Sequence, residues 1–331
     1  MRALITGGCG FIGQHLTRRL IEKGYAVRIV DNLSNGKKEW LAPIAPIRDC
    51  SIKDDLSQWD AGAIQLLIGD IQNEMLALNA ARGATLVVHL AANTGVAPSL
   101  VNPREDMNVN VLGVFNYLEA CRQNQVRRFV FASSSATIGN VEPPIHEGLP
   151  SRPISPYGAS KLAGEAYCSA YAGSFNIDTV ALRFGNVYGP GSSRKESVVA
   201  KFIRRALAGE VLEVYGDGDQ TRDFIYIDDL VESIWRSATT PNIGGEVFQI
   251  ATGNETTLQE LIKSLKNALA AEGVACPTIV FGEPRLGDMK RNYSDTGKAQ
   301  RLMGWKTAVT LKDGLRRTVR SLIAETTSRR S

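Results

Sequence analysis

The stretch that decides the fold is RALITGGCGFIG, residues 2–13. Its first five residues are a short apolar run typical of a buried strand, and a helical apolar pattern begins at Phe11. Between the two, Gly7, Gly10 and Gly13 follow the spacing GxxGxxG. Glycines there allow a tight turn and close approach of a ligand to the backbone, and the helix N-terminus offers unpaired N–H donors. The stretch therefore predicts a binding loop for a dinucleotide pyrophosphate.

The next apolar run, AVRIVD, ends on Asp31. A carboxylate at this place can accept hydrogen bonds from both ribose hydroxyls of NAD. The same carboxylate would repel the 2′-phosphate of NADP, and no arginine follows Asp31 immediately. The residues therefore favour NAD over NADP as the cofactor.

Apolar runs and helical patterns alternate along the chain. The expected strands are 2–6, 26–31, 64–70, 85–91, 128–134, 178–189 and EVFQIATG, and the expected helices are 11–22, 105–121, 156–171, 198–208, IDDLVESIW and 257–271. This alternation predicts an α/β fold with a Rossmann-type, doubly wound parallel sheet. We expect an NAD-binding domain over 1–180, joined by 223–251, and a smaller α/β substrate-binding domain over 181–222 and 252–328.

Composition and charge exclude several classes of protein. The 331 residues are 44% hydrophobic and 22% charged, and the net charge of +4 comes from intermixed acids and bases, which is too mild to indicate nucleic-acid binding. No apolar run reaches membrane-spanning length, and the N-terminus has no secretory pattern. The five cysteines are scattered without metal-ligand spacing, so we expect a cytoplasmic protein without a metal site.

A second constellation lies in SPYGASK, residues 155–161, and in the upstream hydroxyl run ASSSATIG, residues 132–139. Tyr157 and Lys161 are four residues apart, which places them on one helix face. An ammonium group favours the ionised form of a nearby phenol and lowers its pKa, which is roughly 10 in free tyrosine. The pair therefore predicts a tyrosine base.

Several motifs occur in a fixed order: TGGCGFIG, DNLSNG, HLAA, SSSA, YGASK, RFGNVYGP and TRDFIYIDDL. With them, from about residue 2 to residue 320, the chain resembles the extended short-chain dehydrogenase/reductase family. Within that family it looks most like the NAD-dependent nucleotide-sugar epimerase/dehydratase branch, in particular the UDP-glucose 4-epimerases. The resemblance implies that the smaller domain binds a nucleotide sugar.

The resemblance also implies a catalytic group. Tyr157 would be the base, and Lys161 would lower its pKa and bond the nicotinamide ribose. Ungapped alignment of the strand at 128–134 gives Ser134 as the catalytic hydroxyl, and Ser135 is the alternative if the loop shifts by one residue. Ile138 stands where the family usually has a tyrosine.

Further binding residues follow from the same resemblance. The implied cofactor-binding residues are Gly7, Gly10, Phe11, Ile12, Gly13, Asp31, Asn32, Asp70, Ile71, Leu90, Ala91, Ala92 and Asn110, together with Tyr157 and Lys161. The implied substrate-binding residues are Ser135, Asn186, Val198, Tyr215, Arg222 and Arg285. Guanidinium groups suit the diphosphate because they pair with phosphate in a bidentate manner.

The activity implied is 4-epimerisation of a UDP-sugar through a 4-keto intermediate. Dehydratases and decarboxylases on the same scaffold carry an acid two positions after the catalytic hydroxyl, where this chain has Ala136. Glu142 and Glu147 in the following loop remain possible replacements. A one-way NADPH reductase is disfavoured by Asp31, and a non-catalytic NAD-binding regulator by the presence of both Tyr157 and Lys161.

Substrate choice and assembly are further expectations from the resemblance. Asn186 stands where glucuronate epimerases tend to carry threonine. Asn292 stands where strict glucose/galactose enzymes carry a tyrosine that blocks an N-acetyl group. We therefore expect acceptance of both glucose/galactose and 2-acetamido sugars. The family also implies a homodimer built from the helices at 105–121 and 156–171.

Overall fold

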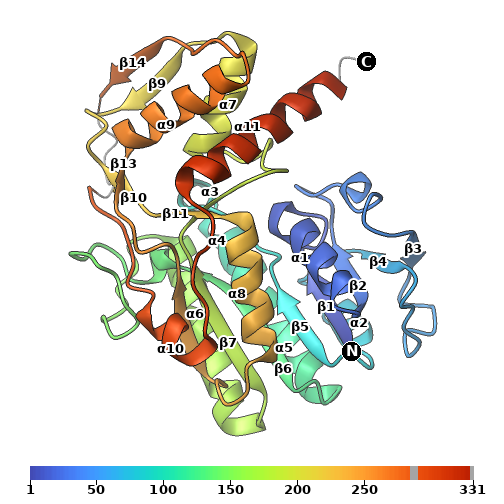
Figure 1. The fold of residues 1–331 in the computed structure, drawn as a ribbon. Helices are drawn as coiled ribbons and strands as arrows, with labels where there is room; N and C mark the ends of the chain where they lie inside the picture. The colour runs from blue at the N-terminus through green and yellow to red at the C-terminus, as the bar shows by residue number, and fades with distance from the viewer. Residues whose placement is uncertain (284–289, 329–331) are drawn as a thin grey trace.

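An eight-stranded sheet forms the centre of the computed structural model, which describes residues 1–283 and 290–328 (Figure 1). Its strand order is β12-β7-β6-β5-β1-β2-β4-β3, and all seven neighbouring pairs are parallel. The strands are β1 (Arg2–Thr6), β2 (Ala26–Asp31), β3 (Ile47–Cys50), β4 (Ile64–Ile68), β5 (Leu86–His89), β6 (Arg128–Ser134), β7 (Asp178–Phe184) and β12 (Glu246–Ile250). The Rossmann-type parallel sheet expected from the sequence is confirmed.

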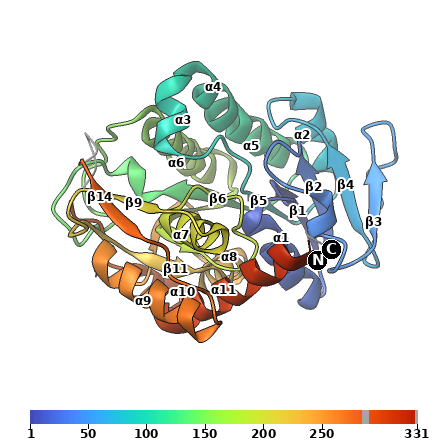
Figure 2. The same cartoon turned by 90° about the horizontal axis from the view of Figure 1, so that it is seen from above.

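Helices cover both faces of this sheet (Figure 2). α1 (Phe11–Glu22) and α8 (Ile227–Thr239) pack together on one face. The other face carries α2 (Glu74–Ala80), α3 (Val96–Val101), α4 (Pro103–Met107), α5 (Gly113–Gln123) and α6 (Pro156–Phe175). Two separate hydrophobic cores result. Ile5 of β1 points into the core under α1, whereas its neighbour Leu4 points into the core under α2 and α5, as strand alternation requires.

A second group of elements lies above the edge at which the strands of the large sheet end (Figure 1). Three two-stranded sheets pair β8 (Asn186–Tyr188) with β11 (Phe224–Tyr226), β9 (Leu212–Tyr215) with β14 (Ile279–Gly282), and β10 (Thr221–Arg222) with β13 (Thr256–Thr257). This group also contains α7 (Val198–Ala208), α9 (Leu258–Ala271) and α11 (Leu311–Ser328), whereas α10 (Gly297–Met303) packs against β12 of the large sheet. In parallel α/β sheets this edge is where ligands bind.

The expected helix over 105–121 is interrupted. α4 ends at Met107, a π-helical turn spans 108–112, and α5 begins at Gly113. Wide turns of this kind occur where side chains must be re-aimed, and they are frequent at functional sites. By contrast, the expected cap at Thr257 is confirmed, because its hydroxyl accepts from the Glu260 N–H and the Glu260 carboxylate accepts from the Thr257 N–H.

Candidate active site

The glycine loop between β1 and α1 has the geometry of a phosphate cradle. Gly7 has φ +71°, a left-handed conformation that glycine adopts without strain. A Cβ on Gly13 would lie 2.3 Å from the Gly7 carbonyl oxygen, so the turn and helix pack too closely for any side chain. A Cβ on Gly10 would meet only that same oxygen, at 3.2 Å, which leaves room beside Gly10. α1 also has no acid in its first turn, and its N-terminus has no side-chain cap among the described residues.

Asp31 lies at the end of β2, directly beside this loop. Its carboxylate accepts hydrogen bonds from the backbone N–H groups of Cys9 (2.9 Å) and Leu33 (2.8 Å), which fix its orientation. Burial raises the pKa of Asp31, and these two hydrogen bonds oppose the rise. Next to it, the Asn32 amide donates to the Asp70 carboxylate (2.9 Å), joining the ends of β2 and β4. The loop, Asp31, Asn32 and Asp70 therefore form one contiguous surface that fits a dinucleotide.

The residues that follow β5 lie next to the glycine loop. A Cβ on Gly7 would lie 2.8 Å from the Ala91 nitrogen, and the Ala91 N–H donates to the Thr6 hydroxyl (3.1 Å). Leu90 and Ala92 flank Ala91 and are half-buried, as Phe11 and Ile12 are, whereas Ile71 is buried. Asn110 is buried in the π-helical turn. Its side chain forms two hydrogen bonds with the backbone of Asn93, in the loop that follows β5. The structure thus brings the expected cofactor-binding residues to one edge of the sheet.

The tyrosine and lysine lie on the first turns of α6. Ser155 caps this helix by accepting from the Gly158 N–H (3.1 Å), and Pro156 occupies its first turn, which explains where the helix begins. Tyr157 is half-buried, and the side chain of Ser134 at the end of β6 is near enough to lower its pKa. The ammonium group of Lys161 is buried, lies 5.8 Å from the Tyr157 ring centroid and donates to the Ala132 carbonyl (2.8 Å).

Burial, and not Lys161, dominates the pKa of Tyr157 in this structure, and the pKa-lowering effect expected of Lys161 stays a prediction. Burial raises the pKa of Tyr157 to about 12, and the side chain of Ser134 only partly opposes this rise. The Lys161 ammonium donates to a backbone carbonyl, and burial lowers its own pKa to about 8. Burial is the largest cause of both pKa shifts, and Lys161 is not among the causes that act on Tyr157.

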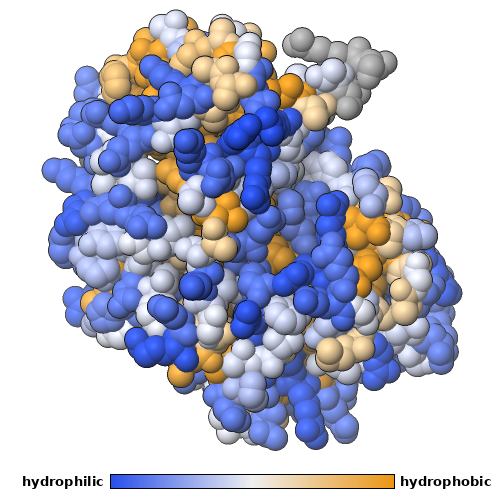
Figure 3. Space-filling view, viewed as in Figure 1, coloured by the Kyte–Doolittle hydropathy of each residue, from blue (hydrophilic) through white to orange (hydrophobic). Residues whose placement is uncertain are grey.

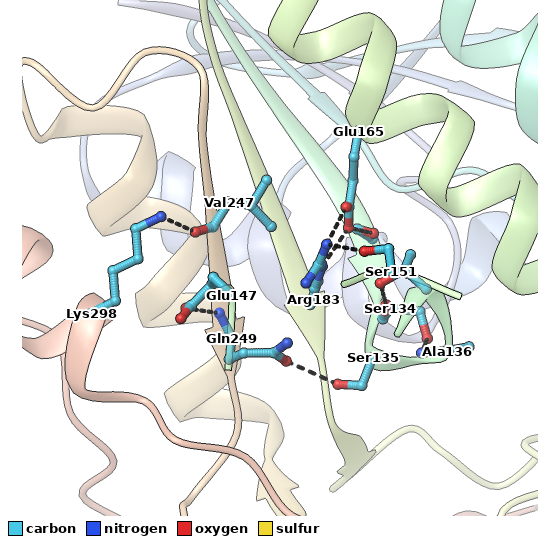
Figure 4. A network of polar contacts seen from close by, with 12 residues as sticks. Ser134, Ser135, Ala136, Glu147, Ser151, Glu165, Arg183, Val247, Gln249 and Lys298 are labelled. Atoms are coloured by element: carbon cyan, nitrogen blue, oxygen red, sulfur yellow. Dashed lines mark hydrogen bonds and ion pairs between the residues drawn. The ribbon is translucent and has the colours of Figure 1, made fainter. Parts of the chain in front are cut away.

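The neighbouring hydroxyls are held differently (Figure 4). Ser135 is buried and donates to the Gln249 side chain on β12 (3.1 Å), whereas Ser134 accepts from the Ala136 N–H (3.2 Å). Under them, the Ser133 hydroxyl donates to Glu165, and Glu165 forms a buried ion pair with Arg183 of β7 (2.6 Å). This geometry favours Ser134 as the hydroxyl partner of Tyr157 and shows what anchors the strand that carries it.

The expected substrate-side residues lie on the elements above the sheet edge. Asn186 is exposed at the start of β8, Val198 begins α7, and Tyr215 ends β9. Arg222 on β10 is half-buried and donates to the Thr221 carbonyl (2.7 Å). Arg285 lies outside the described residues. A cavity of about 540 Å³ lies elsewhere and contains none of these residues; it is lined by His146, Glu147, Gly148, Asp295, Lys298 and Arg301.

Sequence reasoning missed four polar residues of this region: Asp106, Glu165, Arg183 and Gln249. Each is at most 5% exposed. Asp106 precedes Asn110 by four residues, so helical spacing offered a signal for that pair. The contacts of Arg183 and Gln249 join residues that are far apart in the sequence, so no local pattern predicts them.

Comparison with known proteins identifies the family. A family model described as the NAD dependent epimerase/dehydratase family matches residues 3–251. The chain belongs to this family. Its members are NAD-dependent enzymes, which agrees with the glycine cradle and Asp31.

Individual family members cover nearly the whole chain. The UDP-glucose 4-epimerase of Mycolicibacterium smegmatis is 35% identical over 324 residues, covering 96% of this chain and 97% of that relative. The structure of Thermotoga maritima UDP-glucose 4-epimerase with UDP-glucose is 34% identical with a TM-score of 0.86, covering 98% of this chain and 100% of that one. A UDP-N-acetylglucosamine 4-epimerase from Methanobrevibacter ruminantium is 29% identical with a TM-score of 0.85, covering 98% of each chain.

Among residues 1–283 and 290–328, no helix is long and apolar enough to cross a bilayer. Within the same ranges, no three His, Cys, Asp or Glu side chains gather as a metal site would require.

Proposed function

We propose that this enzyme interconverts the C4 epimers of a UDP-sugar, with Tyr157 as the base, Lys161 as its cationic partner and Ser134 as the positioning hydroxyl. The observation that carries the proposal is the placement of Tyr157 and Lys161 on one face of α6, with the Lys161 ammonium 5.8 Å from the Tyr157 ring centroid, at the sheet edge that holds the glycine cradle and Ser134. The relatives support it, because those compared are UDP-sugar 4-epimerases that match the chain almost end to end.

Each of the proposed site residues has a distinct role in the epimerisation. The phenolate form of Tyr157 accepts the proton of the C4 hydroxyl and becomes the phenol, and Ser134 holds the same substrate oxygen in line with it. Bound NAD would supply a reversible hydride acceptor at C4, so that the reaction involves no net oxidation. Gly7, Gly10 and Gly13 would hold its pyrophosphate, and Asp31 its ribose. Arg222 and Arg285 would grip the diphosphate of the substrate while the 4-keto sugar turns its other face to the cofactor.

A dehydratase or decarboxylase is the alternative, and the loop after β6 speaks against it. Ala136 occupies the position of the extra acid, and alanine cannot transfer a proton. Glu142 forms an ion pair with Arg291, and Glu147 accepts a hydrogen bond from the Gln249 backbone N–H (2.7 Å). Both glutamates considered as replacements therefore have other partners, which supports epimerisation.

The sugar pocket is expected to admit a 2-acetamido group. Asn292 follows the end of the undescribed segment, and its N–H donates to the Thr221 hydroxyl (3.3 Å), which places it beside Arg222. Asparagine is smaller than the tyrosine of strict enzymes, so an N-acetyl group has room.

This expectation is tested by separating the products after incubation with UDP-glucose and with UDP-N-acetylglucosamine, without added cofactor. Both sugars should be epimerised, and Asn292→Tyr should lower kcat/KM for the acetamido sugar at least tenfold while sparing UDP-glucose. Activity of the wild-type protein on UDP-glucose alone would contradict the pocket assignment. Release of water or carbon dioxide would instead favour the alternative reactions.

We propose a homodimer built from the helices expected over 105–121 and 156–171, which are α4, the π-helical turn, α5 and α6. Large apolar side chains are exposed on these elements and on α3, which packs against α4 and α6: Leu100, Val101, Met107, Leu112 and Tyr167. Val101, at 87% exposure, is the most solvent-accessible of them. Large apolar side chains that are exposed on neighbouring elements are typical of a protein interface.

Analytical ultracentrifugation tests the dimer. The wild-type protein should sediment as a dimer, and the double variant Val101→Glu/Leu112→Glu as a monomer, because two buried charges per subunit would be left unpaired. The matched control is Phe281→Glu, an exposed apolar residue of β14, and it should remain dimeric. β14 is labelled at the top of Figure 1, where the same view in Figure 3 shows hydrophobic surface. A monomeric wild type, or a control that dissociates equally, would refute this interface.

Placement in the cytoplasm also belongs to this proposal. All five cysteines lie within the described residues and are free thiols. Free thiols are typical of a reducing compartment.

A further inference from the structure

Asp106 is a buried carboxylate to which the mechanism above gives no role. It lies on α4 and is 0% exposed. One of its oxygens accepts from the Ser160 hydroxyl (2.6 Å), and the other accepts from the Asn110 amide (2.9 Å). Burying a carboxylate is costly unless hydrogen bonds and a nearby positive charge compensate. The two neutral donors supply hydrogen bonds, and the charge must come from elsewhere.

These hydrogen bonds join the two halves of the site. Ser160 directly precedes Lys161 on α6, one turn after Tyr157. On the other side, the Asn110 amide donates to the Asn93 carbonyl (2.9 Å) and accepts from the Asn93 N–H (2.9 Å). Asn93 lies in the loop after β5, immediately beyond the cofactor-side residue Ala92. Asp106 therefore connects the catalytic helix to the cofactor-side loop, through the π-helical turn.

The charges around Lys161 identify the partner of Asp106. Two carboxylates, Asp106 and Glu165, raise the pKa of Lys161 against the lowering effect of burial. Glu165 lies on the same helix but is already paired with Arg183 from β7. His89, on β5, is neutral, because burial and the nearby Lys161 lower its pKa to about 3. Asp106 also raises the pKa of Tyr157.

We propose that Asp106 is a positioning residue that supplies the counter-charge of Lys161 and fixes α6 in register with the loop after β5. The inference rests on the proposed roles of Tyr157 and Lys161. It assigns to α4 a function in the reaction, in addition to its place at the proposed dimer interface.

The variant Asp106→Asn tests the charge while keeping the shape. Removing the negative charge favours the phenolate of Tyr157 and disfavours the ammonium of Lys161, so both pKa values fall. Both limbs of the pH profile of kcat should therefore move to lower pH by about half a unit to one unit. A purely structural role would lower kcat and stability without displacing the limbs, and that result would overturn the proposal.

Three further variants separate the causes. Ser160→Ala removes one hydrogen bond but keeps the charge, and Asp106→Glu keeps the charge at a greater length, so both should leave the limbs in place even if kcat falls. Asp229→Asn removes another buried carboxylate, on α8, that accepts from the Ala308 and Val309 N–H groups; it should lower the melting temperature only. If the pH profile of kcat shifts in any of these three variants, the inference is overturned. This criterion does not depend on Asp106→Asn, so the inference can still be tested if that variant fails to fold.

The same assay distinguishes failure of this inference from failure of the proposed function. If Tyr157→Phe remains active, the assignment of the base is wrong. If Tyr157→Phe is inactive and the limbs of Asp106→Asn coincide with those of the wild type, only the role of Asp106 is wrong.

Discussion

Replacing Tyr157 by phenylalanine is expected to lower kcat by about 10²–10⁴-fold, which is the usual contribution of a positioned acid–base group. The phenol is the group proposed to accept the C4 proton, and phenylalanine keeps its ring while removing its oxygen. The change removes one hydroxyl group and leaves the ring next to the Lys161 ammonium, so the fold should be retained. Steady-state kinetics with a UDP-sugar, together with the content of bound NAD, measures both effects.

Ser134→Ala and Ser135→Ala form the matched comparison. The side chain of Ser134 is near enough to lower the pKa of Tyr157, whereas Ser135 bonds Gln249, so the first variant should lose more kcat than the second at equal NAD content. A larger loss of kcat in Ser135→Ala would show that Ser135, and not Ser134, is the catalytic hydroxyl. Wild-type kcat in Tyr157→Phe would exclude the phenol as the base.

Replacing Glu165 by glutamine should reduce the free energy of unfolding by about 3–5 kcal/mol, the usual cost of removing one partner of a buried ion pair. Glu165 and Arg183 are each about 5% exposed, so the guanidinium would stay buried without a counter-charge. The Ser133 hydroxyl, on the strand that carries Ser134, donates to the same carboxylate. Urea denaturation followed by circular dichroism measures the change.

An exposed ion pair provides the control for this measurement. Glu196 pairs with Arg204, but its side chain is 80% exposed, so Glu196→Gln should cost no more than about 1 kcal/mol. Equal costs for the two variants would mean that the buried pair contributes nothing beyond an ordinary surface contact. Failure of Glu165→Gln alone to accumulate as folded protein would agree with the larger cost.

Local signals predicted the fold well. Helices 11–22 and 198–208 begin and end where their apolar spacing indicates, and Thr257 caps its helix. These features depend on neighbouring residues, so they can be read from the sequence. The pairing of β9 with β14 joins residues more than sixty positions apart, and no local pattern indicates it.

The site was predicted in its residue types but not in its energetics. Spacing placed Tyr157 and Lys161 on one helix face, and they lie there. Their pKa values depend on burial, which only the packed structure determines, and burial raises the pKa of Tyr157. The contacts of Asp106 with Ser160 likewise join α4 to a helix 54 residues further along the chain.

The central claim is that hydride leaves C4 of the sugar and returns to the same carbon within one active site. Its most direct test is to convert a UDP-sugar carrying deuterium at C4, in ordinary water, with the purified protein and no added cofactor. Mass spectrometry of the epimer formed should find the deuterium retained at C4. Loss of the deuterium to solvent would show that C4 is deprotonated instead, and would contradict the account.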